Sequence, residues 1–171
     1  ASNGKLIGWA ANLAHHSDIG GKEPGSTCGD AVSIFQEGLK IPLVRICRNG
    51  EPIADIVDFI LCNSRIPNER YGDLQAQIAA NRVGARRLQD AYTRYGDLLI
   101  DCMHELQNYA ERRLRAGIRN LKDGEYSFID YMDDAGVASP DPVKICVKIT
   151  IKGDDLHVDF AGTQGQVSGP I

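Results

Sequence analysis

The period of the hydrophobic pattern changes along the chain, and these changes predict consecutive parts with different structures. Between residues 67 and 95 apolar and aromatic positions recur every three or four residues, which is typical of one face of a helix. Gly96 interrupts this pattern, and a second stripe with the same spacing follows over about residues 97–121. Because the connection is short, the two helices are predicted to form a long antiparallel helical hairpin over residues 67–122.

In the last third of the chain, apolar and polar positions alternate instead. Residues 143–152 read VKICVKITIK, the pattern of a strand with one buried face and one wet face. A turn is expected at residues 153–155, with a return strand over residues 156–160. A further strand is expected around residues 126–132, so residues 123–171 are predicted to form an antiparallel β-meander.

The first part of the chain, residues 1–66, is predicted to be a strand–loop region. A strand is expected over residues 5–11, with its pairing partner before residue 1, and residues 12–30 have the Gly, Pro, Ser and Asp content of a loop. A tight turn is expected at Asn49-Gly50, and residues 53–63 have helical spacing. The fold class predicted for the whole chain is therefore α+β.

Composition and charge exclude several classes of function. The 171 residues are 43% hydrophobic, enough for one ordinary domain or for a piece of a larger one. A formal net charge of −4 argues against binding to nucleic acid or to an anionic membrane. No apolar run reaches the roughly 18 residues that a membrane span needs. The five cysteines are scattered without a CxxC pair, which favours a reducing, cytoplasmic setting over a disulfide framework. Both ends of the sequence look cut from a longer polypeptide.

The strongest candidate for chemistry is the stretch NLAHHSDIGGKEPGS, which holds His15, His16 and Asp18. Imidazole nitrogens and a carboxylate together suit a divalent transition metal. Neighbouring side chains on an extended strand point in opposite directions, so both histidines reach one ion only if the backbone bends. Gly20 and Gly21 permit such tight geometry. An acid–base site and a polar loop with ordinary hydrogen bonds are the two alternatives.

Other polar residues are weaker candidates. Glu23 could line the same loop, and Asp30 is placed to cap a following helix. Asn81 interrupts an apolar helix stripe, where it could fix the helix register or contact a substrate. The glycines near the C-terminal end do not form a GxxxxGK[ST] or GxGxxG motif, so no ATP site is predicted in this chain.

Six segments taken together resemble the hydantoinase B family. They are AANLAHHSDIGGKEPGS, IFQEGLKIP, NSRIPNERYGDLQAQIAANRVGARRL, YAERRLRAGI, DGEYSFIDYMDD and VDFAGTQGQVSGPI. The family includes B-type subunits of N-methylhydantoinase, the corresponding half of 5-oxoprolinase and the α subunit of acetone carboxylase. Its members are several hundred residues longer, so the resemblance implies an internal fragment. The chain departs from the family pattern at Gly165, where proline is common, and at Thr27-Cys28-Gly29, near which the family has a Met-Pro-type sequence.

The resemblance implies an ATP-dependent system of two components. A hydantoinase A-type subunit or domain would carry ATP and activate the substrate, and the B-type chain would hydrolyse a cyclic amide or carboxylate a ketone enolate. Carboxylase relatives hold a divalent metal on histidines and an aspartate, so His15, His16 and Asp18 are the implied ligands of a manganese, zinc or magnesium ion. Whichever histidine is not a ligand could move a proton, and Glu23 and Asn81 are candidate substrate contacts.

The expected function is therefore that of a fragment of the B-type subunit of an ATP-dependent N-methylhydantoinase- or 5-oxoprolinase-like hydrolase. The expected assembly is a cytoplasmic hetero-oligomer, and the fragment alone is expected to be inactive. One alternative is the α subunit of an acetone- or acetophenone-type carboxylase. A second is a non-catalytic scaffold that docks the A-type subunit. A third, an independent metallohydrolase, would need neither ATP nor a partner.

Overall fold

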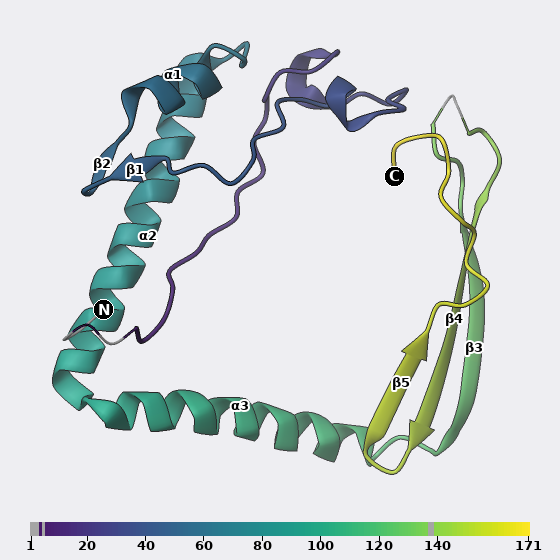
Figure 1. Cartoon of the computed structure of the whole chain (residues 1–171). Coiled ribbons are helices and arrows are strands. Elements are labelled where there is room, and N and C mark those ends of the chain that lie inside the picture. Colours follow the sequence, from purple (N-terminus) through teal and green to yellow (C-terminus); the bar gives the residue numbers. More distant parts are fainter. Residues whose placement is uncertain (1–3, 5, 137–138) are drawn as a thin grey trace. The chain divides into compact units, whose positions relative to one another are not determined.

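The computed structural model describes the chain except residues 1–3, 5 and 137–138. Its described part contains α-helices and two antiparallel sheets, which confirms the predicted α+β class (Figure 1). The chain divides into two compact units, one formed mainly by residues 8–89 and the other mainly by residues 90–169. No helix of the described part is long and apolar enough to cross a membrane.

The first unit contains two of the predicted helices and the predicted tight turn. The helix α1 covers Ala54–Leu61, and α2 covers Pro67–Tyr95, of which all but the last turns belong to this unit. The short strands β1 (Cys47–Arg48) and β2 (Glu51–Pro52) pair antiparallel. Between them Asn49 and Gly50 both have positive φ, of 52° and 85°, as the tight hairpin turn requires.

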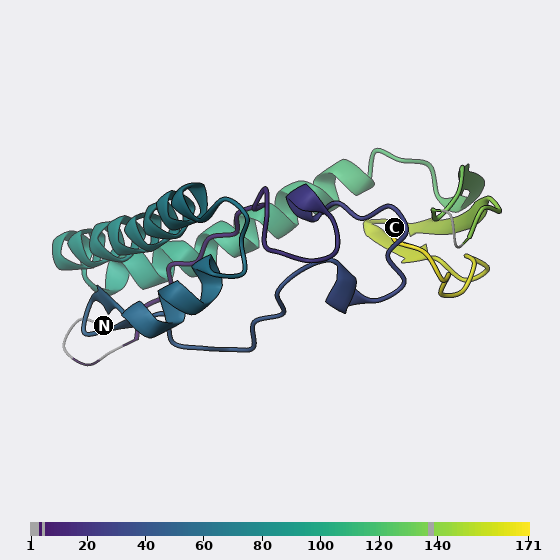
Figure 2. The same cartoon turned by 90° about the horizontal axis from the view of Figure 1, so that it is seen from above.

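The N-terminal segment is extended over residues 6–11, and no strand among the described residues pairs with it. Because the expected partner strand precedes residue 1, the strand itself stays a prediction. The segment runs beside α2, as Figures 1 and 2 both show. A Cβ placed on Gly84 of α2 would lie only 3.3 Å from Ala10, so the small residue allows this approach.

Two short 3-10 helices, η1 (Pro24–Ser26) and η2 (Ile34–Gln36), interrupt the following loop. The predicted capping role of Asp30 is wrong, because the hydroxyl of Ser33 caps η2 by accepting from the Phe35 N–H. Asp30 lies three residues too early and instead binds the Lys22 ammonium and the Cys28 thiol.

The second unit contains the predicted meander. The helix α3 (Asp97–Ile118) follows Gly96, whose φ is +58°. The strands β3 (Gly124–Met132), β4 (Val143–Lys152) and β5 (Asp155–Asp159) form one antiparallel sheet in the order β3-β4-β5, so this prediction is confirmed. Arg115 of α3 binds the Asp155 carboxylate at 2.7 Å and so ties the helix to the β4–β5 turn.

The two long helices are confirmed as elements, but α2 lies mostly in the first unit and α3 in the second. Their packing as an antiparallel hairpin therefore stays a prediction. The division into three parts at residues 66 and 122 also stays a prediction.

Candidate active site

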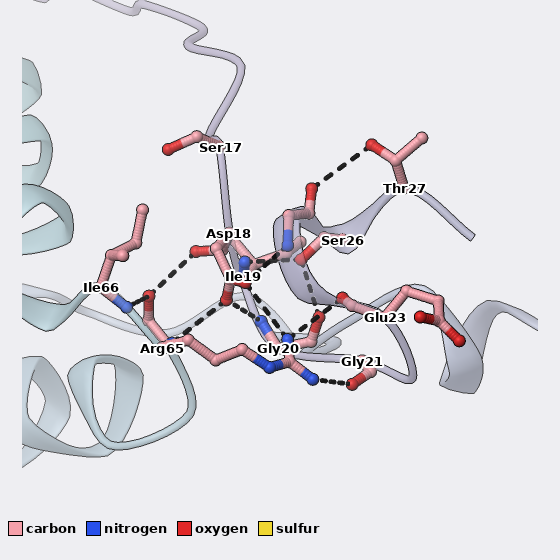
Figure 3. Close-up of polar contacts among 12 residues, drawn as sticks. Ser17, Asp18, Ile19, Gly20, Gly21, Glu23, Ser26, Thr27, Arg65 and Ile66 are labelled. Carbon is pink, nitrogen blue, oxygen red and sulfur yellow. Dashed lines mark hydrogen bonds and ion pairs between the residues drawn. The ribbon is translucent and has the colours of Figure 1, made fainter.

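The loop of residues 12–30, called the histidine loop below, is built around the carboxylate of Asp18, which is only 3% exposed. Oδ1 accepts hydrogen bonds from the N–H groups of Gly20 (3.0 Å) and Arg65 (3.2 Å). Oδ2 accepts from the Gly25 N–H at 2.9 Å and from Arg65 Nη1 at 3.2 Å (Figure 3). The backbone N–H of Gly20, followed by that of Gly25, holds the pKa of Asp18 far below its ordinary value. Asp18 is therefore an ionised anchor for the loop.

Arg65, in the connection between α1 and α2, binds the same loop through its guanidinium group. Its guanidinium donates to the carbonyl of Glu23 at 3.1 Å and to that of Gly21 at 2.7 Å, and its side chain runs along the loop in Figure 3. The neighbouring Ser64 hydroxyl donates to the Asp18 carbonyl at 3.1 Å. Since the planar guanidinium makes several of these bonds at once, it fixes the shape of the loop as well as its position.

The Gly20-Gly21 pair is needed for steric reasons. Both residues have positive φ, of 88° and 87°. A Cβ on Gly20 would lie 2.6 Å from the carbonyl oxygen of Asn63, and a Cβ on Gly21 would lie 2.6 Å from that of Gln36. The predicted tight local geometry is thus confirmed, and it brings the loop against the backbone of two other segments.

His16 is held by residues of α2. Arg70 Nη1 lies within hydrogen-bonding distance of His16 Nδ1, and Gln77 Oε1 lies 3.1 Å from His16 Nε2. An arginine side chain can only donate, so Nδ1 accepts and Nε2 carries the proton that is donated to Gln77. Both ring nitrogens are therefore in use. Arg70 also donates to the Ser17 hydroxyl and to the Asp73 carboxylate, each at 3.0 Å.

The hydrogen bonds continue in one direction along α2. Gln77 Nε2 donates to Asn12 Oδ1 at 3.1 Å, and Asn12 Nδ2 donates to Asn81 Oδ1 at 2.8 Å. A chain of donors thus runs from Arg70 through His16, Gln77 and Asn12 to Asn81. It aligns the extended N-terminal segment with the helix and specifies the His16 tautomer.

Both histidines line a hollow of about 400 Å³ beside the histidine loop, called the histidine hollow below. Its wall also includes Ser26, Thr27 and Glu37. The His15 side chain is exposed, whereas the imidazole of His16 is partly buried. Imidazoles, hydroxyls and a carboxylate around one hollow are the groups that proton transfer to a polar substrate uses.

The structure brings together only part of the predicted set. His15 and His16 share the hollow, whereas both oxygens of Asp18 are already taken by N–H donors. Glu23 contacts Arg65 through its carbonyl and has an exposed side chain, and Asn81 lines a different hollow. Within the described ranges, no three His, Cys, Asp or Glu side chains are placed to hold a metal ion. These residues do not by themselves form a ligand set, and metal binding stays a prediction.

Sequence reasoning missed Arg70, Gln77 and Asn12, which hold His16 and the N-terminal segment. A signal was available for the helix residues, since the polar positions 70, 73, 77 and 81 recur every three or four residues. Such a row of polar residues beside an apolar stripe indicates a helix face that binds another segment through hydrogen bonds.

Comparison with known proteins gives a consistent family assignment. The family model described as hydantoinase B/oxoprolinase matches residues 1–171. A protein of Pseudomonas sp. (strain NS671), provisionally named as the B-type subunit of a D-/L-hydantoinase, is 40% identical over 96% of this chain and 28% of its own length. The crystal structure of ATP-dependent caprolactamase from Pseudomonas jessenii has a TM-score of 0.82 and 36% identity, over 91% of this chain and 27% of that one.

A relative with a different activity is more distant. The acetophenone carboxylase delta subunit of Aromatoleum aromaticum is 28% identical over 98% of this chain and 25% of its own length. The chain thus spans between a quarter and a third of the length of these relatives.

Proposed function

The chain belongs to the hydantoinase B/oxoprolinase family, and we propose that the intact protein is the B-type subunit of an ATP-dependent hydrolase of cyclic amides. The observation that carries this proposal is the histidine hollow, which a buried carboxylate and an arginine clamp hold in place. Relatives named for hydantoin and for caprolactam are more similar to this chain than the carboxylase subunit is, which favours hydrolysis over carboxylation.

The two histidines are proposed to have different roles. His15 is exposed within the hollow, so its imidazole is the one placed to move a proton to or from a bound amide. His16 uses Nδ1 and Nε2 in hydrogen bonds to Arg70 and Gln77, so it is suited to support the wall of the hollow. Ser26 and Thr27 supply hydroxyl groups to the same hollow.

The proposal includes a partner and a nucleotide. Relatives are named as B-type and beta subunits, and one solved relative is an ATP-dependent caprolactamase. We place ATP on an A-type subunit, as the resemblance to the family implies. We also place the assembly in the cytoplasm, where the five free thiols would stay reduced.

Whether the intact protein binds a metal ion through these histidines is tested separately from its activity. Both oxygens of Asp18 and both ring nitrogens of His16 already take part in hydrogen bonds. His16 could bind a metal ion only after losing one of these contacts, and His15 would need further ligands from beyond the described residues. Metal analysis of the intact protein, beside the His15→Ala/His16→Ala double variant, is the measurement. Stoichiometric metal that the variant loses would support these ligands, and equal metal in both proteins would exclude them.

The test of function is reconstitution of the intact chain with its A-type partner. Ring opening of hydantoin and of caprolactam is measured with and without ATP, and with and without bicarbonate. Ring-opened acid that requires ATP and both subunits, but not bicarbonate, is the expected result. Carboxylation of acetone or acetophenone without any ring opening would overturn hydrolysis in favour of the carboxylase alternative. Full ring opening by the partner alone would leave this chain the role of a scaffold.

A further inference from the structure

We infer that a second, apolar pocket beside the histidine hollow is a subsite for an uncharged hydrocarbon part of the substrate. This inference rests on the proposed function, because it names the kind of cyclic amide that the same site accepts. The pocket has a volume of about 230 Å³. Its wall is formed by the apolar side chains Ile19, Leu39, Ile41, Ile60 and Leu74.

The pocket adjoins the histidine hollow, because His16 and Ile19 line both spaces. We place the polar atoms of a ligand in the hollow and its apolar part in the pocket. The volume equals that of roughly eight water molecules, which leaves room for a branched alkyl or phenyl group.

The polar end of the pocket consists of His16 and Arg70. Arg70 is only 1% exposed, and its charge is already paired with Asp73. Its Nε–H has no hydrogen-bond partner among the described residues, which is costly for a buried donor. Arg70 therefore gives this end of the pocket a guanidinium group whose charge is already compensated by Asp73.

A charged substituent does not suit this pocket. Its walls offer apolar carbon on nearly all sides, and a carboxylate placed there would lose its hydration without gaining a new counter-ion. Burial of hydrocarbon, by contrast, is favourable, and each carbon that leaves water strengthens binding roughly fourfold. The subsite should therefore select alkyl- or aryl-substituted rings over rings that carry an acidic side chain.

The test compares three hydantoins on the intact protein: unsubstituted, 5-isopropyl and 5-carboxymethyl. Binding is measured by titration calorimetry, and kcat/KM for ring opening is measured with the partner subunit and ATP. We expect 5-isopropylhydantoin to bind at least tenfold more tightly than the unsubstituted ring, and 5-carboxymethylhydantoin to bind more weakly than either. Equal binding of all three, or tightest binding of the acidic compound, would overturn the inference.

Two substitutions test whether the preference for the 5-isopropyl ring depends on this pocket. Leu74→Phe narrows the pocket from α2, and Ile41→Phe narrows it from a side chain that is 42% exposed and tolerates a larger group. Val83→Phe is the matched control, since Val83 lies on α2 and is 40% exposed outside the pocket. We expect the two pocket variants to lose the isopropyl preference and to keep binding of the unsubstituted ring, whereas the control keeps both.

The outcomes separate this inference from the proposed function. Tighter binding of the 5-isopropyl compound without any turnover would support the subsite and overturn the proposed hydrolase function. Turnover without apolar preference, or a preference that persists in both pocket variants, would retain the hydrolase and overturn the subsite. Filling of the pocket by another segment of the longer chain would also abolish the preference and so overturn the inference.

Discussion

Replacement of Gly21 by alanine tests whether the histidine loop owes its shape to close backbone contact. Gly21 and Gly25 lie in the same loop with similar φ, of 87° and 81°, so an alanine at either position costs about 1–2 kcal/mol for its left-handed backbone. At Gly25 the nearest atom to a new Cβ would be the Ser17 carbonyl oxygen, at an ordinary 3.7 Å. Gly25→Ala is therefore the matched control for backbone strain alone.

At Gly21 the new Cβ would also collide with fixed atoms. It would lie 2.6 Å from the carbonyl oxygen of Gln36 and 2.7 Å from the carbonyl carbon of Glu37, both of which are backbone atoms. Relief of such overpacking costs about 1–3 kcal/mol more. The total for Gly21→Ala is about 2–5 kcal/mol, and the adjacent Lys22 N–H bond to Gln36, of 2.7 Å, is the first contact to be lost.

Hydrogen exchange of the loop amides in the intact protein measures this difference. Since 1.4 kcal/mol is a factor of ten, Gly25→Ala should reduce protection of the Lys22 amide, and of the Leu39 amide that donates to the Ile19 carbonyl, by roughly 5- to 30-fold. Gly21→Ala should reduce it roughly 5- to 160-fold further, as the additional 1–3 kcal/mol implies. Equal losses in the two variants would show that the close approach of the backbone contributes nothing, and the steric argument would be wrong.

Three further predictions concern titration, tautomer and thiol reactivity. Asp18 has a pKa well below its ordinary value of 3.8 in the folded state. The ionised carboxylate therefore stabilises the fold fully above pH 3.8, and this stabilisation is lost as the pH falls below that value. The melting temperature should accordingly fall more steeply on acidification in the wild type than in Asp18→Asn. Arg70 can only donate to His16 Nδ1, so ¹⁵N NMR should show the Nε2–H tautomer of His16 both in the wild type and in Gln77→Leu; an Nδ1–H tautomer in either protein would contradict the assignment. A hydrogen bond to a neighbouring carboxylate, together with burial, raises the pKa of the Cys28 thiol, so iodoacetamide should label Cys28 at least about tenfold more slowly than the exposed Cys62, as followed by mass spectrometry; comparable rates would contradict the burial.

Regular hydrophobic periods explain which parts of the fold could be predicted. The helix over residues 67–95 and the strand over residues 143–152 were predicted with their observed bounds, because their patterns repeat over many residues. Residues 6–11 look like a strand, but no strand in the described part of the chain pairs with them, and pairing is not visible in local sequence.

The candidate site could be predicted only where chemistry is concentrated in a short stretch. His15, His16 and the glycine pair stand together in the sequence, so their importance for a site and for a tight loop could be inferred. Contacts between residues more than 40 positions apart in the sequence could not be inferred. They include the pairing of Arg65 with Asp18 and of Arg70 with His16. The same contacts explain why Asp18 serves as an anchor in this structure, although its spacing suggested a ligand.

The most direct test of the proposed function is ring opening by the assembled complex with His15→Ala in place of the wild-type chain. His104→Ala, which changes an exposed histidine on α3, is the matched control. Since a positioned acid or base contributes roughly 10²–10⁴-fold, we expect His15→Ala to reduce kcat at least about 100-fold while the subunits still associate. The control should open the ring at the wild-type rate. Unchanged ring opening by an assembled His15→Ala complex would contradict the account, because the histidine hollow would then not be where the amide is hydrolysed.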